Sequence, residues 1–297
     1  MEFKPTGIIP PLVTPVDHNE NLNKDALRQL VERLLGAGVH GVFAMGSQGE
    51  FWAFTPEEKR EVIDTVVRQV NGRVPVYAGT GAPTTRECIE LTRMAEASGA
   101  DAVSVLTPYF ISPSQDELYE HYVAIARSTH LPVVLYGNPG RTGVSLSVDL
   151  VSRLSEVDGI VGIKDSSGDL SLTAEYIRNT GPDFATLAGR DTLIYGTLAY
   201  GGKGSVAATA NAAPALVVEI YNSFVQGDLE KARQAQARLA PLRQAFGLGS
   251  FPVVIKDAVT MTGIPVGPAR GPVRSLEGAP REKLTRILGE LGLLKEQ

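Results

Sequence analysis

The 297-residue chain contains one cysteine, Cys88, which excludes an intrachain disulfide framework and fits a reducing compartment. No segment offers the roughly twenty consecutive apolar residues that a membrane helix needs, and the first residues contain no apolar signal core. Long runs of like charge are also missing, and the net charge is -5, so nucleic acid and anionic membranes are poor candidate partners. We therefore expect a cytoplasmic protein with no nucleic-acid or membrane partner.

Metal-binding patterns are missing as well. The four histidines lie near predicted helices or loops and show no spacing typical of metal ligands: His18, His40, His121 and His130. With 43% apolar residues, however, the chain can bury a large core.

Short β-branched segments alternate with amphipathic helical patterns along most of the chain. We expect strands at 7–13, 41–44, 74–78, 102–106, 133–136, 159–164, 185–188 and 204–208. We expect helices between them at 24–35, 56–70, 84–98, 115–128, 147–154, 172–179 and 192–200. Each unit is long enough for a crossover between parallel strands. The pattern favours a closed (β/α)8 TIM barrel over an open doubly wound sheet.

Four further helices are expected after the eighth unit, at 213–224, 228–246, 251–262 and 281–294. We interpret residues 1–212 as the barrel core and residues 213–297 as a helical extension packed on it within one structural unit. The glycine-rich run Gly201–Gly204 precedes a strand and does not open a helix, so we interpret it as a helix-to-strand turn and not as a phosphate cradle.

The C-terminal ends of barrel strands build active sites, and two of these ends carry reactive side chains. Lys164 ends the sixth predicted strand, where burial would lower the pKa of an amine and allow it to attack a ketone. Tyr136 ends the neighbouring fifth strand, within reach of the same cavity, and a phenol can donate or accept a proton. The alternatives, a lysine whose head reaches water and a core tyrosine, stay open at this point.

A turn of small residues, Gly46–Glu50, follows the second predicted strand. Its backbone N–H groups can converge on a carboxylate, and Ser47 can pass a proton to Tyr136. The simpler interpretation is a serine hydroxyl that satisfies its own turn.

Three motifs together resemble the pyruvate-dependent class I aldolases that include dihydrodipicolinate synthase and N-acetylneuraminate lyase, over nearly the whole chain. Gly46–Glu50 is similar to the family's Gly-(Ser/Thr)-Thr-Gly-Glu element, Tyr136–Gly143 to Tyr-Asn-x-Pro-x-Arg-Thr-Gly, and Gly162–Asp165 to Gly-Ile-Lys-Glu/Asp. The resemblance implies a homotetramer built as a dimer of dimers, with no cofactor and no metal.

The resemblance also implies roles for individual residues. Lys164 would form a covalent imine with pyruvate, Tyr136 would transfer protons, and the N–H groups of Ser47 and Gln48 would hold the pyruvate carboxylate. Arg141 would bind the carboxylate of an aldehyde partner, through two parallel hydrogen bonds. Family members also place the positions of Gly189 and Val206 near this pocket.

Several positions depart from the family pattern. Gln48 replaces a second hydroxyl residue, and an amide is a poor proton shuttle. Phe110 stands where a tyrosine usually reaches across the subunit interface, although a shift by one residue would give that role to Tyr109. Gly137 replaces a common asparagine and Trp52 is large beside the turn. Pro56 and Lys59 stand where lysine-inhibited synthases tend to carry histidines, so we do not expect feedback by lysine.

The expected activity is the condensation of pyruvate with aspartate semialdehyde, as in dihydrodipicolinate synthases. A second possibility is an aldolase for 2-keto-3-deoxy sugar acids or 4-hydroxy-2-oxo acids. A third, of another class, is a catalytically weakened protein that binds keto acids.

Overall fold

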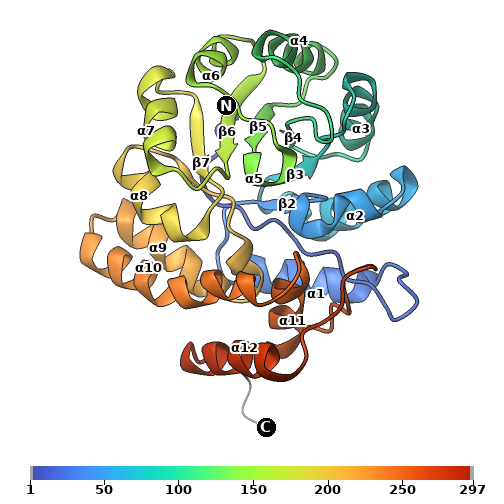
Figure 1. Cartoon of the computed structure of the whole chain (residues 1–297), viewed down its shortest axis with the longest axis vertical. Coiled ribbons are helices and arrows are strands. Elements are labelled where there is room, and N and C mark those ends of the chain that lie inside the picture. The colour runs from blue at the N-terminus through green and yellow to red at the C-terminus, as the bar shows by residue number, and fades with distance from the viewer. Residues whose placement is uncertain (1–2, 295–297) are drawn as a thin grey trace.

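The structure is a computed structural model that describes residues 3–294, and Figure 1 shows its helices arranged around a set of parallel strands. The strands are β1 (Gly7–Ile8), β2 (Val42–Ala44), β3 (Val76–Gly79), β4 (Ala102–Leu106), β5 (Val133–Gly137), β6 (Ile160–Asp165), β7 (Ala185–Ala188) and β8 (Gly204–Ser205). The α-helices between them are α1 (Lys24–Gly36), α2 (Pro56–Val70), α3 (Thr85–Ala97), α4 (Gln115–Ala126), α5 (Pro139–Thr142), α6 (Val148–Ser155), α7 (Leu170–Asn179) and α8 (Ile194–Ala199). The predicted order of strands and helices is confirmed.

The eight strands close into a barrel. They are hydrogen-bonded in the order β1-β8-β7-β6-β5-β4-β3-β2, and every pair is parallel. Between β1 and β2 the ring closes through a bridge of Pro11 with Phe43, in which the Leu12 N–H donates to the Phe43 carbonyl over 2.8 Å. The first strand is shorter than the predicted range 7–13 because Pro10 and Pro11 have no N–H to donate to a ladder.

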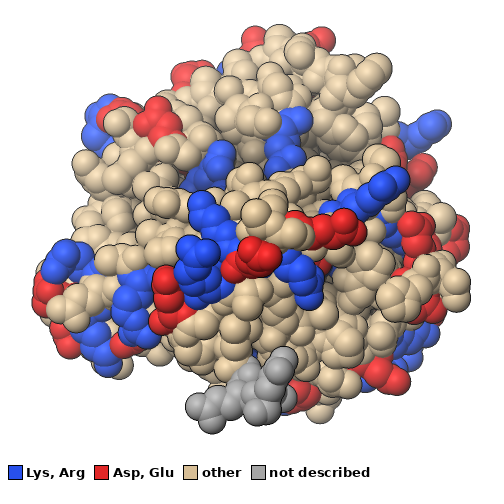
Figure 2. All heavy atoms as spheres, turned by 60° about the horizontal axis from the view of Figure 1, so that its bottom comes forward, with Lys and Arg blue, Asp and Glu red and all other residues tan. Residues whose placement is uncertain are grey.

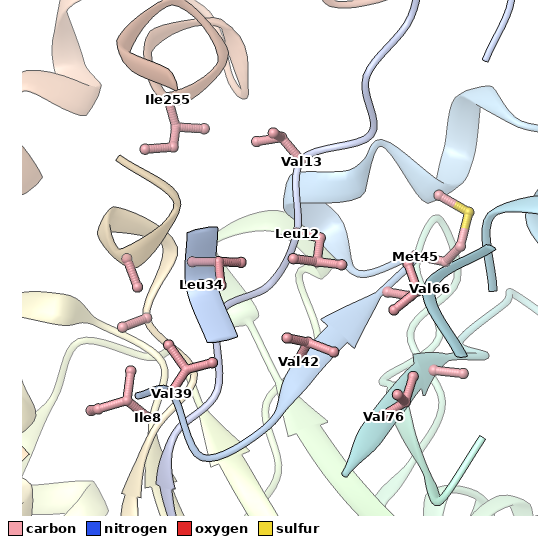
Figure 3. Close-up of a cluster of buried hydrophobic side chains, with 14 of the residues drawn as sticks. Ile8, Leu12, Val13, Leu34, Val39, Val42, Met45, Val66, Val76 and Ile255 are labelled. Carbon is pink, nitrogen blue, oxygen red and sulfur yellow. The ribbon is translucent and has the colours of Figure 1, made fainter. Parts of the chain in front are cut away.

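The strands are buried on both faces, as expected for a parallel sheet covered by helices. Inside the ring, one cluster draws a side chain from nearly every strand or the residues beside it: Ile9, Phe43, Tyr77, Ala102, Val134, Leu187 and Val206. A larger cluster, part of which Figure 3 shows around Leu12, Val42 and Val76, fills the space between strands and helices. The barrel is therefore a packed core that leaves room for a ligand only at its mouth.

Helix boundaries follow local sequence signals. Thr55 accepts a hydrogen bond from the Glu58 N–H and Glu58 bonds back to the Thr55 N–H, a capping box that starts α2. Gly38 and Gly99 follow the ends of α1 and α3 with positive φ angles of 79° and 83°, the left-handed conformation that commonly ends a helix. Helix α7 begins earlier than predicted because Asp169 caps it, accepting from the N–H groups of Ser171 and Leu172.

Several short elements escaped the prediction. Helix α5 follows β5 directly, with a proline at its first turn. Only Gly204–Ser205 of the expected strand 204–208 pairs in the sheet, and the residues beyond it enter a 3-10 turn, η4 (Ala208–Asn211). Two more 3-10 turns, η1 (Ser47–Gly49) and η2 (Phe51–Ala53), follow β2, and another, η3 (Asp191–Leu193), follows β7.

The last part of the chain is helical. It contains α9 (Pro214–Val225), α10 (Leu229–Gln244), the 3-10 turn η5 (Ala245–Leu248), α11 (Val253–Met261) and α12 (Gly278–Glu290). Helix α10 ends two residues before the predicted Phe246, where the chain tightens into η5. Figure 1 places α10, α11 and α12 together along one side of the molecule, in orange and red. Residues 1–2 and 295–297 of the proposed division lie outside the described residues, and the division itself stays a prediction.

The distribution of charges and the hydropathy of the helices agree with the composition of the chain. On the face that Figure 2 presents, Lys and Arg side chains are interspersed with Asp and Glu. In residues 3–294, no helix combines the length and the hydropathy needed to cross a bilayer.

Candidate active site

Lys164 and Tyr136 are direct neighbours across the sheet. They occupy paired positions of β6 and β5, near the C-terminal ends of both strands. The Lys164 Nζ lies 3.7 Å from the centroid of the Tyr136 ring and 5.1 Å from that of Phe43. The side chains that the sequence placed on adjacent strand ends therefore meet.

The Lys164 amine has no carboxylate partner. The residue is 4% exposed, and within residues 3–294 it makes no salt bridge. Its neighbour Asp165 points to the other face of β6, where it accepts hydrogen bonds from the Ser167 N–H and the Thr173 hydroxyl. Because side chains alternate along the strand, this carboxylate lies on the opposite face from the amine. The burial of Lys164 contradicts the alternative of a lysine whose head extends into bulk water.

Tyr136 is the centre of a small hydrogen-bond network. Its hydroxyl lies 3.3 Å from the Ser47 hydroxyl, and the Asn138 side-chain amide donates to it over 3.0 Å. Burial alone would raise the pKa of Tyr136, but the charge of Lys164 and the bonds with Ser47 and Asn138 outweigh it, so the pKa is lowered. A phenol held in this way is suited to exchange a proton beside the amine.

The turn after β2 presents backbone donors to the same space. Within the turn, the Gly49 N–H donates to the Gly46 carbonyl, and the Glu50 N–H donates to the Ser47 carbonyl. The N–H groups of Ser47 and Gln48 are not used by the turn and remain available for an anion.

A buried ion pair holds this turn in place. Glu50 adopts a left-handed conformation with φ 58° and accepts from Lys256 of α11 over 2.7 Å and from the Arg270 N–H over 2.8 Å. The Lys256 amine also donates to the Thr14 carbonyl over 2.9 Å. Burial lowers the pKa of Lys256, and the charge of Glu50 opposes that shift. The sequence analysis missed Lys256, although a lysine within the apolar run of α11 is a signal for a buried charge.

Lys164 and Tyr136, together with Ser47 and Gln48 of the turn, line a cavity of about 450 Å³ at the mouth of the barrel. Of the residues predicted for the site, the cavity wall contains Ser47, Gln48, Tyr136, Arg141, Lys164, Gly189 and Val206. It also contains residues that the sequence analysis did not select, among them Asn138, Ser166, Arg190, Arg243, Phe246 and Phe251. The structure brings the first group together, while their chemical roles stay predictions.

Tyr109 and Phe110 are not part of this cavity wall in the single chain. Tyr109 packs edge-on against Phe51, whose ring contacts Trp52, which in turn packs on Phe251 of the wall. Burial raises the pKa of Tyr109 to about 12. Phe110 is 99% exposed and has a φ of 73°, so its side chain points away from the molecule.

The departures at positions 48 and 137 have visible consequences. Gln48 is 9% exposed, and its side-chain oxygen has no hydrogen-bond partner in the part of the chain that the structure describes. Gly137 leaves room beside Leu146, and the following residue, Asn138, supplies the amide that contacts Tyr136.

Among residues 3–294, no group of three or more His, Cys, Asp and Glu side chains is placed to hold a metal ion. His121 contacts Thr85 and Cys88 between helices, and His40 accepts a hydrogen bond from the Ile8 N–H. Both histidines therefore have packing roles away from the cavity.

A lysine beside a tyrosine at the mouth of a (β/α)8 barrel is compatible with imine chemistry, and comparison with known proteins assigns the chain to the class I, pyruvate-dependent lyases and synthases. The chain belongs to the dihydrodipicolinate synthetase family, whose model matches residues 4–291. It is 42% identical to a 4-hydroxy-tetrahydrodipicolinate synthase of Methanopyrus kandleri, over 100% of this chain and 99% of the relative.

Other relatives show the breadth of this family. An uncharacterized DapA-like lyase of Halobacterium salinarum is 38% identical, over 97% of this chain and 94% of its own. The crystal structure of YagE, a prophage protein of the dihydrodipicolinic acid synthase family from E. coli K12 in complex with pyruvate, superimposes with a TM-score of 0.93 at 34% identity. That match covers 97% of this chain and 99% of YagE. The comparisons thus establish the family and leave the second substrate open.

Proposed function

We propose that this protein joins pyruvate to a carboxylate-bearing aldehyde through a lysine imine. The observation that carries the proposal is the pair of Lys164 and Tyr136 facing one cavity, with Ser47 bonded to the phenol. The free N–H groups of Ser47 and Gln48 are suited to hold the pyruvate carboxylate and so to present its ketone to the amine.

The steps use only groups in the cavity. The Lys164 nitrogen attacks the ketone carbon, and the hydroxyl group leaves as water with a proton from the Tyr136 hydroxyl. The protonated imine then withdraws electrons, so that a methyl proton passes to the Tyr136 oxygen and restores the phenol. The resulting enamine attacks the aldehyde carbon, and the aldehyde oxygen takes a proton from the Tyr136 hydroxyl as the carbon-carbon bond forms. Hydrolysis of the imine then frees the lysine and gives a 4-hydroxy-2-oxo acid, which the reverse sequence cleaves. With aspartate semialdehyde as the partner, its amine attacks the imine carbon instead and displaces the lysine, which closes the ring of the product without added water.

Arg141 supports a carboxylate on the aldehyde partner. Its guanidinium lies 3.7 Å from the Phe251 ring centroid at the wall of the cavity that Lys164 also lines, and it makes no ion pair within residues 3–294. Together with the similarity to the Methanopyrus kandleri synthase, this favours aspartate semialdehyde as the partner and 4-hydroxy-tetrahydrodipicolinate synthesis as the reaction.

The second candidate is a 2-keto-3-deoxy sugar-acid aldolase, and Gln48 is the observation that favours it. Its buried, unpartnered amide oxygen lines the cavity and can accept a hydrogen bond from a substrate hydroxyl, which aspartate semialdehyde does not have. The two candidates are separated by comparing turnover of pyruvate and aspartate semialdehyde with cleavage of 2-keto-3-deoxygluconate.

The altered proton relay gives a sharper version of this test. If Gln48 and Phe110 impair synthase chemistry, the double variant Gln48→Thr, Phe110→Tyr gains synthase turnover that the parent lacks. An efficient parent synthase would show that the relay argument is wrong. A protein that only binds keto acids would turn over neither substrate and would form no reduced pyruvate adduct with borohydride.

We also propose a homotetramer, with Phe110 at a contact between copies. A fully exposed phenylalanine with a positive φ angle combines an apolar surface with backbone strain, and contact with a second copy would offset both. Sedimentation of the parent and of Phe110→Asp tests this: the parent is expected as a tetramer and the variant as a smaller species.

A further inference from the structure

Three arginines line the cavity without a carboxylate partner. Arg141 follows β5, Arg190 follows β7 and Arg243 lies near the end of α10, so they come from three distant parts of the chain. Within the described residues, Arg141 and Arg243 make no hydrogen bond or ion pair through their guanidinium groups, and Arg190 donates only to the Ser166 carbonyl over 3.3 Å.

Aromatic rings and backbone hold the three guanidinium groups at the wall. Arg141 stacks on Phe251, and the Arg243 Cζ lies 4.7 Å from the centroid of the Phe246 ring. These contacts fix the planes of the cations while leaving their N–H donors free, an arrangement suited to a ligand with several acceptor oxygens.

The three charges also act on one another. The pKa of Arg141 is lowered by partial burial; Tyr136 opposes this shift, and the charges of Arg190 and Arg243 add to it. The pKa of Arg243 is also lowered by burial, with Arg190 adding to the shift. Asp191 opposes the shift at Arg243, but this buried carboxylate already accepts from the backbone N–H groups of Ala208 and Thr209. Asp191 therefore offsets the effect of Arg190 at Arg243, whereas no carboxylate of residues 3–294 forms an ion pair with Arg141.

One aldehyde carboxylate cannot neutralise three cations. Arg141 alone accounts for a single carboxylate, which leaves Arg190 and Arg243 at the cavity wall without an anionic partner in the part of the chain that the structure describes. Aspartate semialdehyde brings one carboxylate and an ammonium group that all three cations would repel, so the arginines favour a different aldehyde partner, one whose second negative charge would pair with them.

We propose that Arg190 and Arg243, together with Arg141, form a subsite for a far end of the aldehyde partner that carries two negative charges. Such an end is a phosphate monoester or a pair of carboxylates, and both present several oxygens to the guanidinium donors. The inference rests on the proposed function for the identity of the ligand as the aldehyde partner, and it makes Arg190 and Arg243 specificity-determining residues for that reaction.

Binding of small dianions tests the subsite without any turnover. Inorganic phosphate and malonate are titrated into the full-length protein by calorimetry, into Arg190→Gln and Arg243→Gln, and into Arg233→Gln as a control. Arg233 lies on the same helix as Arg243 but is paired with Glu230 on the surface, so its loss changes the net charge equally without touching the cavity. Each cavity variant is expected to weaken binding about tenfold, and the control to leave it unchanged.

The preferred probe identifies the source of the charges, since phosphate stands for a phosphate monoester and malonate for two carboxylates. Binding of neither dianion to the parent, or equal binding by the parent and both cavity variants, would overturn the proposal. Parent and variants are also treated with pyruvate and borohydride. If the parent forms no reduced pyruvate adduct, the proposed function alone is refuted. If the parent forms the adduct but binds neither phosphate nor malonate, the subsite alone is refuted.

In turnover assays, glyceraldehyde 3-phosphate or a malonate-bearing aldehyde is expected to exceed neutral glyceraldehyde in kcat/KM by about tenfold or more, with the preference lost in both cavity variants. Equal kcat/KM for charged and neutral aldehydes in the parent would contradict the assignment.

Discussion

Replacement of Lys256 by methionine tests how the turn Gly46–Glu50, proposed to bind the pyruvate carboxylate, is held in place. Lys256 is fully buried, and the side chain of its partner Glu50 is 2% exposed. Removing one member of a buried ion pair leaves the other charge uncompensated, which costs about 3–5 kcal/mol of unfolding free energy. The Thr14 carbonyl loses its donor at the same time.

The measurement is urea denaturation at a fixed protein concentration, followed by far-UV circular dichroism and by the fluorescence of Trp52, the single tryptophan. Lys231→Met is the control, because Lys231 is exposed and lies 3.8 Å from Glu219, a pair expected to contribute less than about 1 kcal/mol. The double variant Lys256→Met, Glu50→Gln removes both charges and keeps an acceptor for the Arg270 N–H, so it is expected to be more stable than Lys256→Met alone.

The same variants report on function. If the ion pair positions the turn, Lys256→Met raises the KM for pyruvate more than it lowers kcat, because the N–H groups of Ser47 and Gln48 move while Lys164 stays on its strand. A loss of stability below 1 kcal/mol, or a double variant less stable than the single one, would refute the reasoning from the buried pair.

Two further predictions concern protons. Tyr136→Phe removes the hydroxyl beside Lys164 and is expected to lower kcat about a hundredfold to ten-thousandfold in steady-state assays; unchanged turnover would exclude Tyr136 as the proton-transfer group. His121 is buried, and desolvation lowers its pKa from 6.5 to about 4, so the unfolded chain binds more protons between these values and stability falls as the pH falls through that window. The loss of unfolding free energy is at most about 3 kcal/mol. His121→Gln should flatten this part of the plot of unfolding free energy against pH, measured by urea titration. Identical plots for the parent and the variant would show that another group is responsible.

The barrel was predictable because the information is local. Each strand carries its own β-branched run and each helix its own caps, as in the box formed by Thr55 and Glu58, so the order of elements can be read segment by segment. Parallel pairing of consecutive strands then brings Tyr136 and Lys164 together without further assumptions. The lengths of the strands were less predictable, since pairing stops where Pro10 and Pro11 offer no donor.

The missing parts of the site depend on contacts between distant segments. Arg243 and Lys256 belong to helices whose position over the barrel mouth is set by packing, and no periodic pattern records which of their side chains faces the cavity. The proposed role of Phe110 is out of reach for another reason, because a contact between copies of the chain would lie outside the single chain, in which this side chain is exposed.

The central claim is that Lys164 bonds covalently to pyruvate. The most direct measurement is borohydride reduction in the presence of pyruvate, followed by peptide mass mapping of the parent and of Lys164→Arg. The account predicts one reduced pyruvate per chain, located on Lys164, and none on the variant. A folded parent that stays unlabelled, or a label that persists when Lys164 is replaced, would contradict it.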